Sequence, residues 1–273
     1  MQALLILGMH RSYTSLVSRW LGACGLNLGD KLLPKGVGNQ DGHFEDTAIL
    51  DLHRKALRQA GLQGNGMVEI GQPAFDQSRY AALSFEGDLH AEACRLLERK
   101  IDAGMPFAWK EPRTCLFLPF YRKQLDCRSL VLFRGHQEVV GSLLAREGPA
   151  LRDFYYRGIK RPLYWLNKSS IDQQVGALKD GFLDAWIHYN SCLLDHIERE
   201  GVDRTIVHDL QSLAPRSSSV IAKLNAWGVN VVDRSLNDFV RPLSNYDTLD
   251  FDTGRRERAD EITARFRDLI ERG

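Results

Sequence analysis

The sequence predicts an α/β fold in three layers, with a central parallel sheet flanked by helices. Short, continuous apolar runs alternate along the chain with longer segments of helical period, a pattern typical of a parallel sheet covered on both faces. The first apolar run ends at a glycine and leads directly into a helix. The 273 residues, 44% of them hydrophobic and 26% charged, suffice to bury a full core.

The N-terminal elements follow from local patterns. The apolar run Ala3–Leu7 is typical of a buried strand, and Gly8 ends it. A helix is expected over Thr14–Ala23, because its apolar side chains recur at helical spacing and Gly25 is placed to end it. A further helix is expected over Thr47–Arg58.

The same alternation recurs in the second half of the chain. Strands are expected over Phe107–Trp109, Ser129–Phe133 and Thr205–Val207, and helices over Thr114–Gln124, Glu138–Arg146, Asp180–Arg199 and Val220–Trp227. Residues 61–84 and 149–170 have weaker periodicity, and we expect them to be insertions that bind substrate or form a lid. The chain is therefore expected to form a single domain over residues 1–273.

Charge and cysteine content narrow the class of protein. The 36 Lys and Arg residues balance 35 Asp and Glu residues to a formal charge of +1, which argues against a binder of nucleic acid, so any anion site must be local. The five cysteines are scattered without a C-x-x-C pair, as expected for reduced thiols. No apolar run is long enough for a signal peptide or a membrane span, and we expect a cytoplasmic protein. The sequence does not predict the oligomeric state.

The segment GMHRSYTS lies where the first strand turns into the first helix. Unpaired backbone N–H groups and the positive helix end make this geometry suitable for phosphate or sulfate. The kinase motif G-x-x-x-x-G-K-[ST] fails, because Tyr13 replaces its second glycine and no lysine follows. What remains is the guanidinium of Arg11 and the hydroxyls of Ser12, Thr14 and Ser15. The alternative is that Ser12 and Thr14 only cap the helix.

This segment resembles the 5′-phosphosulfate loop of the sulfotransferases that use 3′-phosphoadenosine 5′-phosphosulfate (PAPS), whose bacterial branch typically shows G-M-H-R-S-G-T-S. The resemblance implies the P-loop-like fold of that family. It also implies that the donor is bound by Arg11, Ser12, Tyr13, Thr14 and Ser15. We expect Tyr13 to avoid a left-handed backbone, or the loop to tolerate strain, with the tyrosine ring projecting toward the acceptor.

A second segment, LVLFRGHQEVVGSLL, resembles the 3′-phosphate site of the same family, an Arg after a strand and a Ser on the next helix. Arg134 and Ser142 take these places, at the sheet edge where α/β folds bind ligands. The Asp/Asn-Pro that usually follows the Arg is replaced by Gly135-His136. The alternative, a surface ion pair between Arg134 and Glu138, is disfavoured by the joint occurrence of the two segments.

A third segment, FAWKEPRTCLFLPFYRKQL, resembles the central segment of the family, with Lys110 matching its lysine and Pro119 its later proline. Cytosolic steroid and phenol sulfotransferases carry a catalytic His two residues after that lysine, whereas this chain has Pro112. Sulfonyl transfer needs an aligned hydroxyl, a base, and cations on the developing charge. We assign the cations to Arg11 and Lys110, and no metal is required.

The candidate base comes from NQDGHFED, which resembles the G-x-F/Y-E-D stretch of the bacterial branch. Tyrosylprotein sulfotransferases take a Glu from the region after the first helix, which favours Glu45. His43 is the alternative, because histidine titrates near neutral pH. Glu45 and Asp46 could instead only start the helix Thr47–Arg58 with favourable N-terminal charges.

These segments together predict in-line transfer of sulfonate from PAPS to the hydroxyl of a small molecule or saccharide, with release of adenosine 3′,5′-bisphosphate (PAP). Two alternatives stay open: a P-loop kinase of a small molecule, disfavoured by the missing lysine, and an inactive nucleotide-binding homologue, supported by the departures from the family pattern. The acceptor is expected along residues 61–84 and along DFYYRGIKRPLYWLNK, where Lys160 and Arg161 are placed to meet an acidic group.

Overall fold

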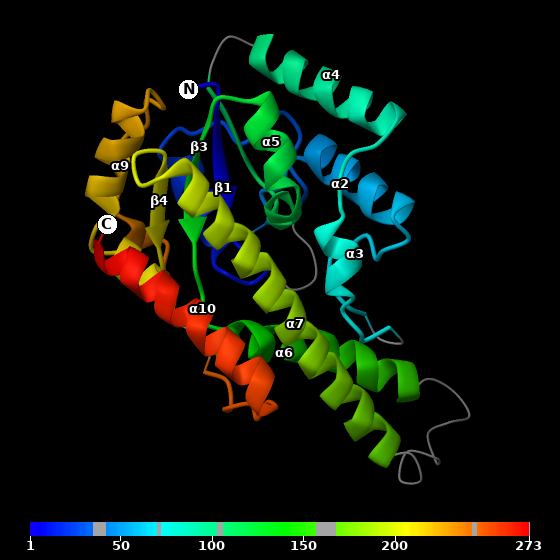
Figure 1. Ribbon diagram of the computed structural model, residues 1–273. Helices are drawn as coiled ribbons and strands as arrows, with labels where there is room; N and C mark the ends of the chain where they lie inside the picture. Colours follow the sequence, from blue (N-terminus) through cyan, green and yellow to red (C-terminus); the bar gives the residue numbers. More distant parts are fainter. Residues whose placement is uncertain (35–41, 70–71, 103–105, 157–167, 242–244, 273) are drawn as a thin grey trace.

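The computed structural model describes residues 1–34, 42–69, 72–102, 106–156, 168–241 and 245–272 (Figure 1). Within these ranges four parallel strands form one sheet in the order β2-β1-β3-β4. They are β1 (Ala3–Leu7), β2 (Phe107–Lys110), β3 (Cys127–Leu132) and β4 (Thr205–His208). Leu5 of β1 lies opposite Trp109 of β2 and Ser129 of β3. The predicted parallel sheet is confirmed.

The sheet buries both of its faces. Side chains of β1 alternate between two apolar clusters, with Ala3, Leu5 and Leu7 in one and Leu4 and Ile6 in the other. The first cluster is completed by α2 (Thr47–Gln59), α4 (Asp88–Asp102), α5 (Leu118–Gln124), α6 (His136–Tyr156), α7 (Lys168–Glu200) and α10 (Thr253–Arg272). The second is completed by α1 (Thr14–Ala23), α8 (Leu210–Leu213) and α9 (Ser217–Ala226). In Figure 1, α7 crosses in front of the sheet and α9 lies beside β4. Helices on both faces give the predicted three layers.

Two helices are longer than their sequence patterns indicate. The helix expected to end at Arg146 continues to Tyr156, and the helix expected to begin at Asp180 begins at Lys168. Few apolar side chains mark the first turns of α7, so no helical period stands out there. Residues 149–156 and 168–170, expected within an insertion, are therefore helical. Residues 157–167, with Lys160 and Arg161, lie outside the described residues.

The helix expected over Thr114–Gln124 is divided into two elements. A 3₁₀ helix, η1, spans Pro112–Phe117, and α5 follows over Leu118–Gln124. Pro119 lies in the first turn of α5, where a missing backbone N–H breaks no helical hydrogen bond. The proline therefore places the boundary between the two elements.

Four α-helices of the described residues have no counterpart in the sequence prediction: α3 (Gln77–Ala81), α4, α8 and α10. In α10 the buried stripe is limited to Ala259, Ile262, Phe266 and Ile270, and charged side chains dominate the rest. Such a sparse stripe is a weak signal in the sequence.

No helix in the described part of the chain combines the length and apolar character needed to cross a membrane.

Candidate functional site

The loop that joins β1 to α1 has a constrained backbone at the carboxyl edge of the sheet. Gly8 has φ +156°, and a Cβ there would lie 2.8 Å from the carbonyl oxygen of Leu132, so no side chain fits. Arg11 and Tyr13 adopt left-handed φ angles of 68° and 62°. Each such residue carries strain of about 1–2 kcal/mol. The expectation that Tyr13 avoids this conformation is wrong, and the loop instead tolerates the strain, as loops at functional sites often do.

The N-terminus of α1 is not capped by its N-cap side chain. Tyr13 occupies the N-cap position and makes no side-chain capping hydrogen bond, so neither Ser12 nor Thr14 takes that position. In contrast, α2, α3 and α8 are capped by Asp46, Asp76 and Asp209, whereas α5 and α9, like α1, have no side-chain cap. The first-turn N–H groups and positive end of this 10-residue helix are therefore suited to an anion.

Three residues predicted to bind the donor, from two segments far apart in the sequence, meet beside this loop. Arg11 Nε donates a hydrogen bond to Ser142 Oγ at 2.8 Å, and Arg134 Nη1 donates to the backbone carbonyl of Arg11 at 2.8 Å. Arg134 is buried, and its Nε lies 3.8 Å from Glu138 Oε1. Its closer contact is thus with the loop, and the surface ion pair is a secondary one.

The ring of Tyr13 packs against Arg134, one of the residues predicted to bind the donor. The Arg134 guanidinium carbon is 4.2 Å from the centroid of this ring and 5.9 Å from that of Tyr246. Burial raises the pKa of the Tyr13 hydroxyl, which has no hydrogen-bond partner among the described residues. The ring thus makes a cation–π contact with Arg134, and its projection toward the acceptor stays a prediction.

Two predicted catalytic residues form one buried ion pair. Lys110 Nζ donates to Glu45 Oε1 at 2.9 Å, and both side chains are buried. Lys110 ends β2, the neighbour of β1, so its side chain lies at the sheet edge that also carries the loop. Burial lowers the pKa of Lys110, against the opposing effect of Glu45. Asp46 takes the helix-starting role instead, accepting from the backbone N–H groups of Ala48 and Ile49.

His43 lies beside the loop through its backbone. Ser15 Oγ donates to the carbonyl oxygen of His43 at 3.3 Å. Burial lowers the pKa of the His43 imidazole, with Glu45 opposing and Lys110 reinforcing that shift. The segment that carries both candidate bases is therefore attached to the predicted donor loop.

A buried polar network behind Lys110 was missed by the sequence reasoning. Glu111 accepts a hydrogen bond from Arg113 and contacts His53 Nδ1, while His53 Nε2 lies 2.7 Å from the Tyr121 hydroxyl. Burial alone would raise the pKa of Glu111, but the charges of Arg113 and His53 hold it well below its usual range. The run WKEPR places Glu111 and Arg113 beside Lys110, whereas no pattern marks His53.

The described part of the predicted acceptor segment lies against this network and against α7. Arg113 Nε donates to the carbonyl oxygen of Gly64 at 3.0 Å, and the Tyr189 hydroxyl donates to that of Gly66 at 3.0 Å. Gly66 has φ +73°, and a Cβ there would lie 2.6 Å from the Tyr189 hydroxyl oxygen. These hydrogen bonds therefore hold residues 61–69 near Lys110 and Glu45, the candidate catalytic residues.

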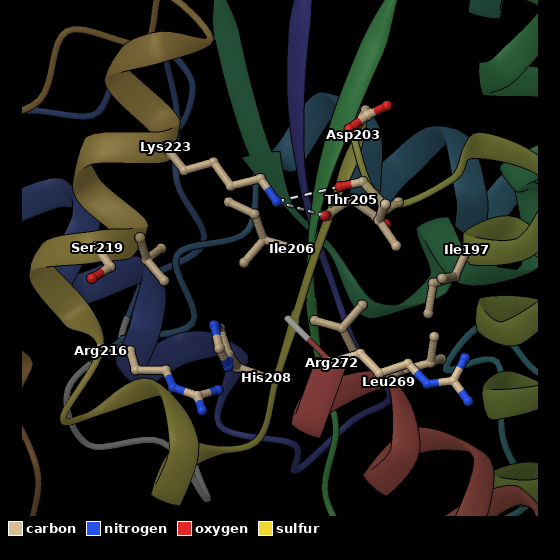
Figure 2. Close-up of a pocket in the computed structure, with 13 residues that line it drawn as sticks. Ile197, Asp203, Thr205, Ile206, His208, Arg216, Ser219, Lys223, Leu269 and Arg272 are labelled. Carbon is tan, nitrogen blue, oxygen red and sulfur yellow. Dashed lines mark hydrogen bonds between the residues drawn. The ribbon is translucent and has the colours of Figure 1, made fainter.

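A pocket of about 380 Å³ lies elsewhere, along β4 between α9 and α10 (Figure 2). Its cations already have partners within the protein. Lys223 Nζ lies 3.5 Å from the Thr205 carbonyl oxygen, Arg216 Nη1 donates to that of Ile270 at 3.2 Å, and Arg272 pairs with a carboxylate of α10. No residue predicted for the site lines this pocket, and we assign it no ligand.

Among the described residues, no group of three or more His, Cys, Asp or Glu is arranged to hold a metal ion.

Comparison with known proteins gives only a distant likeness. No protein-family model and no curated protein matches the sequence. Among solved structures, the chain is similar to the sulfotransferase domain from the curacin biosynthetic pathway, with a TM-score of 0.44 and 12% identity over 88% of this chain and 78% of that one. It is also similar to the sulfotransferase STF9 from Mycobacterium avium, with a TM-score of 0.45 and 14% identity over 97% and 68% of the two chains. Likeness at this level says nothing about the chemistry of the chain.

Proposed function

We propose that the chain is a sulfotransferase that transfers the sulfonate of PAPS to a hydroxyl acceptor. One observation carries the proposal: Arg11, Arg134 and Ser142 meet beside the N-terminus of α1, whose N-cap side chain provides no cap. Burial, followed by the charge of Arg146, lowers the pKa of Arg11, as expected where one buried cation lies near another. A ligand with several anionic groups would relieve this repulsion.

The two phosphate positions of PAPS suit the two halves of this arrangement. The 5′-phosphosulfate would lie at the start of α1, held by the guanidinium of Arg11, the loop hydroxyls and the backbone N–H groups. The 3′-phosphate would lie between Arg134 and Ser142, beside the ring of Tyr13. The hydrogen bond between Arg11 and Ser142 would then be exchanged for bonds to the donor.

Lys110 and Glu45 serve the chemical step in this proposal. The acceptor oxygen bonds to sulfur as the bond from sulfur to the 5′-phosphate oxygen breaks, and that electron pair leaves with PAP. Positive charge from Lys110 and Arg11 stabilises the negative charge that develops, so the chemistry needs no metal. Glu45, as the sequence suggests, takes the acceptor proton, or else holds Lys110 charged and in place; His43 is the alternative base.

The acceptor is proposed to be the hydroxyl of a small molecule or saccharide. Residues 61–69 are hydrogen-bonded to Arg113 and Tyr189, close to Lys110, which supports their predicted role beside the acceptor.

We propose further that residues 1–273 form one domain, because both apolar clusters share one sheet.

Transfer of labelled sulfonate tests this function. With ³⁵S-labelled PAPS and a mixture of metabolites in the presence of EDTA, the protein should label at least one product, because the cations are side chains. Arg11→Ala should lose the activity by a factor of about 100 or more, as expected for removal of a group that stabilises transition-state charge. Phosphoryl transfer from ATP and Mg²⁺, with no sulfonate transfer, would establish the kinase alternative instead.

A further inference from the structure

His10 has an imidazole nitrogen to which the proposed mechanism assigns no role. It directly precedes Arg11 in the donor loop, and its Nε2 is buried without a hydrogen-bond partner among the described residues. The His10 and Tyr189 rings meet edge to face, with centroids 5.9 Å apart. An unpaired buried polar group is unfavourable by about 1–3 kcal/mol. Such a group in a strained loop calls for a function that offsets this cost.

The surroundings of His10 keep its imidazole neutral. The charged and titratable groups that face it are Lys110 of β2, Glu111 after β2, Arg113 of η1, Arg146 of α6 and Tyr189 of α7. Burial first, then the charge of Arg113, lowers the pKa of His10 well below its ordinary value of 6.5, while Glu111 opposes the shift. A neutral imidazole has one nitrogen that can accept a proton.

Within the donor loop, His10 is the residue that contacts Tyr189, which in turn binds the predicted acceptor segment. The ring of Tyr189 contacts that of His10, and its hydroxyl donates a hydrogen bond to the Gly66 carbonyl. The segment 61–69 therefore lies near His10. Lys110 approaches from the adjacent strand, where it pairs with Ile6 of β1. His10 supplies an imidazole near Lys110 from the loop that follows β1.

We propose that His10 is a catalytic residue whose Nε2 accepts the proton of the acceptor hydroxyl. As that proton moves to His10, the acceptor oxygen bonds to sulfur, the bond from sulfur to the 5′-phosphate oxygen breaks, and its electron pair leaves with PAP. The imidazolium then returns its proton to solvent. The inference rests on the proposed function, and it gives Glu45 the second of its two roles, that of holding Lys110 in place.

A bound donor would also improve His10 as a base. The free protein surrounds His10 with three cations, which disfavour the imidazolium. Phosphate and sulfonate oxygens in the neighbouring loop bring negative charge and raise the pKa toward the neutral range. General bases work best when their pKa lies near the working pH.

An NMR titration tests the placement of His10 without any acceptor. The Cε1–H signal of His10, assigned by its loss in His10→Gln, is followed against pH with and without saturating PAP. We expect a pKa below 6.5 that rises when PAP binds, while exposed His90 on α4 serves as the control that does not move. An unchanged His10 pKa in the PAP complex would overturn the proposal.

Turnover tests the catalytic role, with 2-naphthol, a long-chain alcohol and glucosamine as probe acceptors. His10→Gln should lower kcat by about 100-fold or more while PAP affinity and the urea midpoint stay near wild type. The acid limb of the pH profile should disappear, and added imidazole should partly restore His10→Ala. The matched control, His90→Gln, should keep the wild-type rate.

The outcomes separate this inference from the function on which it rests. A wild-type protein that transfers sulfonate, with His10→Gln equally active, would refute only the role of His10. A wild-type protein that neither binds PAP nor transfers sulfonate would refute the function itself. If PAP binds but none of the probes is an acceptor, the NMR titration alone decides the placement.

Discussion

At the scale of single residues, Tyr13 illustrates how this site departs from a nucleotide-kinase loop. Its backbone holds the left-handed conformation that glycine adopts without strain, with φ 62° and ψ 9°. A tyrosine accepts this conformation while its ring packs on the guanidinium of Arg134. Stacking of this kind contributes about 0.5–2 kcal/mol, comparable to the strain. The side chain that interrupts the loop motif thus supports a predicted donor-binding arginine.

Replacement of Tyr13 should therefore alter donor binding. Tyr13→Gly relieves the strain but removes the ring, and we expect PAP affinity to fall by about twofold to fivefold as Arg134 loses its support. Tyr13→Phe, which keeps the ring and removes a hydroxyl without a described partner, should bind PAP as the wild type does. Calorimetric titration of the three proteins provides the measurement. Equal PAP affinity in all three would show that the ring plays no part in donor binding.

The candidate site could be predicted only where its residues lie in local patterns. Arg11 and Ser142 occupy recognisable segments 131 positions apart, and the structure brings them into contact. Glu45 and Lys110, 65 positions apart, are likewise paired. His53 escaped prediction because its partner Glu111 lies on another element, and no local spacing signals such a contact. Likewise, the sequence does not show that His10 Nε2 has no hydrogen-bond partner among the described residues, because this depends on how the loop packs.

At the scale of elements, α10 supports the strand that leads into the proposed donor site. Phe266 of α10 is fully buried and stacks on Phe133, with ring centroids 4.5 Å apart. Phe133 directly precedes Arg134, so this contact fixes the end of the segment that positions the guanidinium. The helix thus stabilises a part of the site that it does not enter.

Loss of this contact should destabilise the protein substantially. Phe266→Ala should lower the free energy of unfolding by about 3–5 kcal/mol, as expected for truncation of a buried aromatic ring. Arg265→Ala on the same helix removes an exposed ion pair with Glu198 and should cost less than about 1 kcal/mol. Urea denaturation of both variants gives the comparison. A loss below about 1 kcal/mol in Phe266→Ala would contradict the packing of α10 against Phe133.

Elements were predictable in proportion to the strength of their apolar pattern. The strand Ala3–Leu7 and the helix Thr14–Ala23 match their predicted bounds, because each has a dense apolar pattern ended by a glycine. By contrast, α10 buries few of its side chains and is otherwise charged, so its helix emerges from packing rather than from periodicity. The first turns of α7 likewise have too few apolar residues in the sequence to predict a helix.

At the scale of the whole molecule, near-neutral charge and a local cluster of cations fit together. The formal charge is +1, so long-range attraction does not select an anionic ligand. Affinity must arise where the carboxyl ends of β1, β2 and β3 bring the loop, Lys110 and Arg134 to one edge of the sheet. The order of the strands thus assembles the site from segments that the sequence holds far apart.

The proposed function depends on recognition of the donor's 3′-phosphate, and calorimetry with PAP and with AMP measures that recognition. The wild-type protein should bind PAP at least about tenfold more tightly than AMP, because AMP lacks the phosphate assigned to Arg134 and Ser142, and a hydrogen bond to a charged group contributes about 1.5–3 kcal/mol. In Arg134→Ala this preference should vanish while AMP binding persists. Equal affinity of the wild-type protein for PAP and AMP would contradict the assignment of PAPS as the donor.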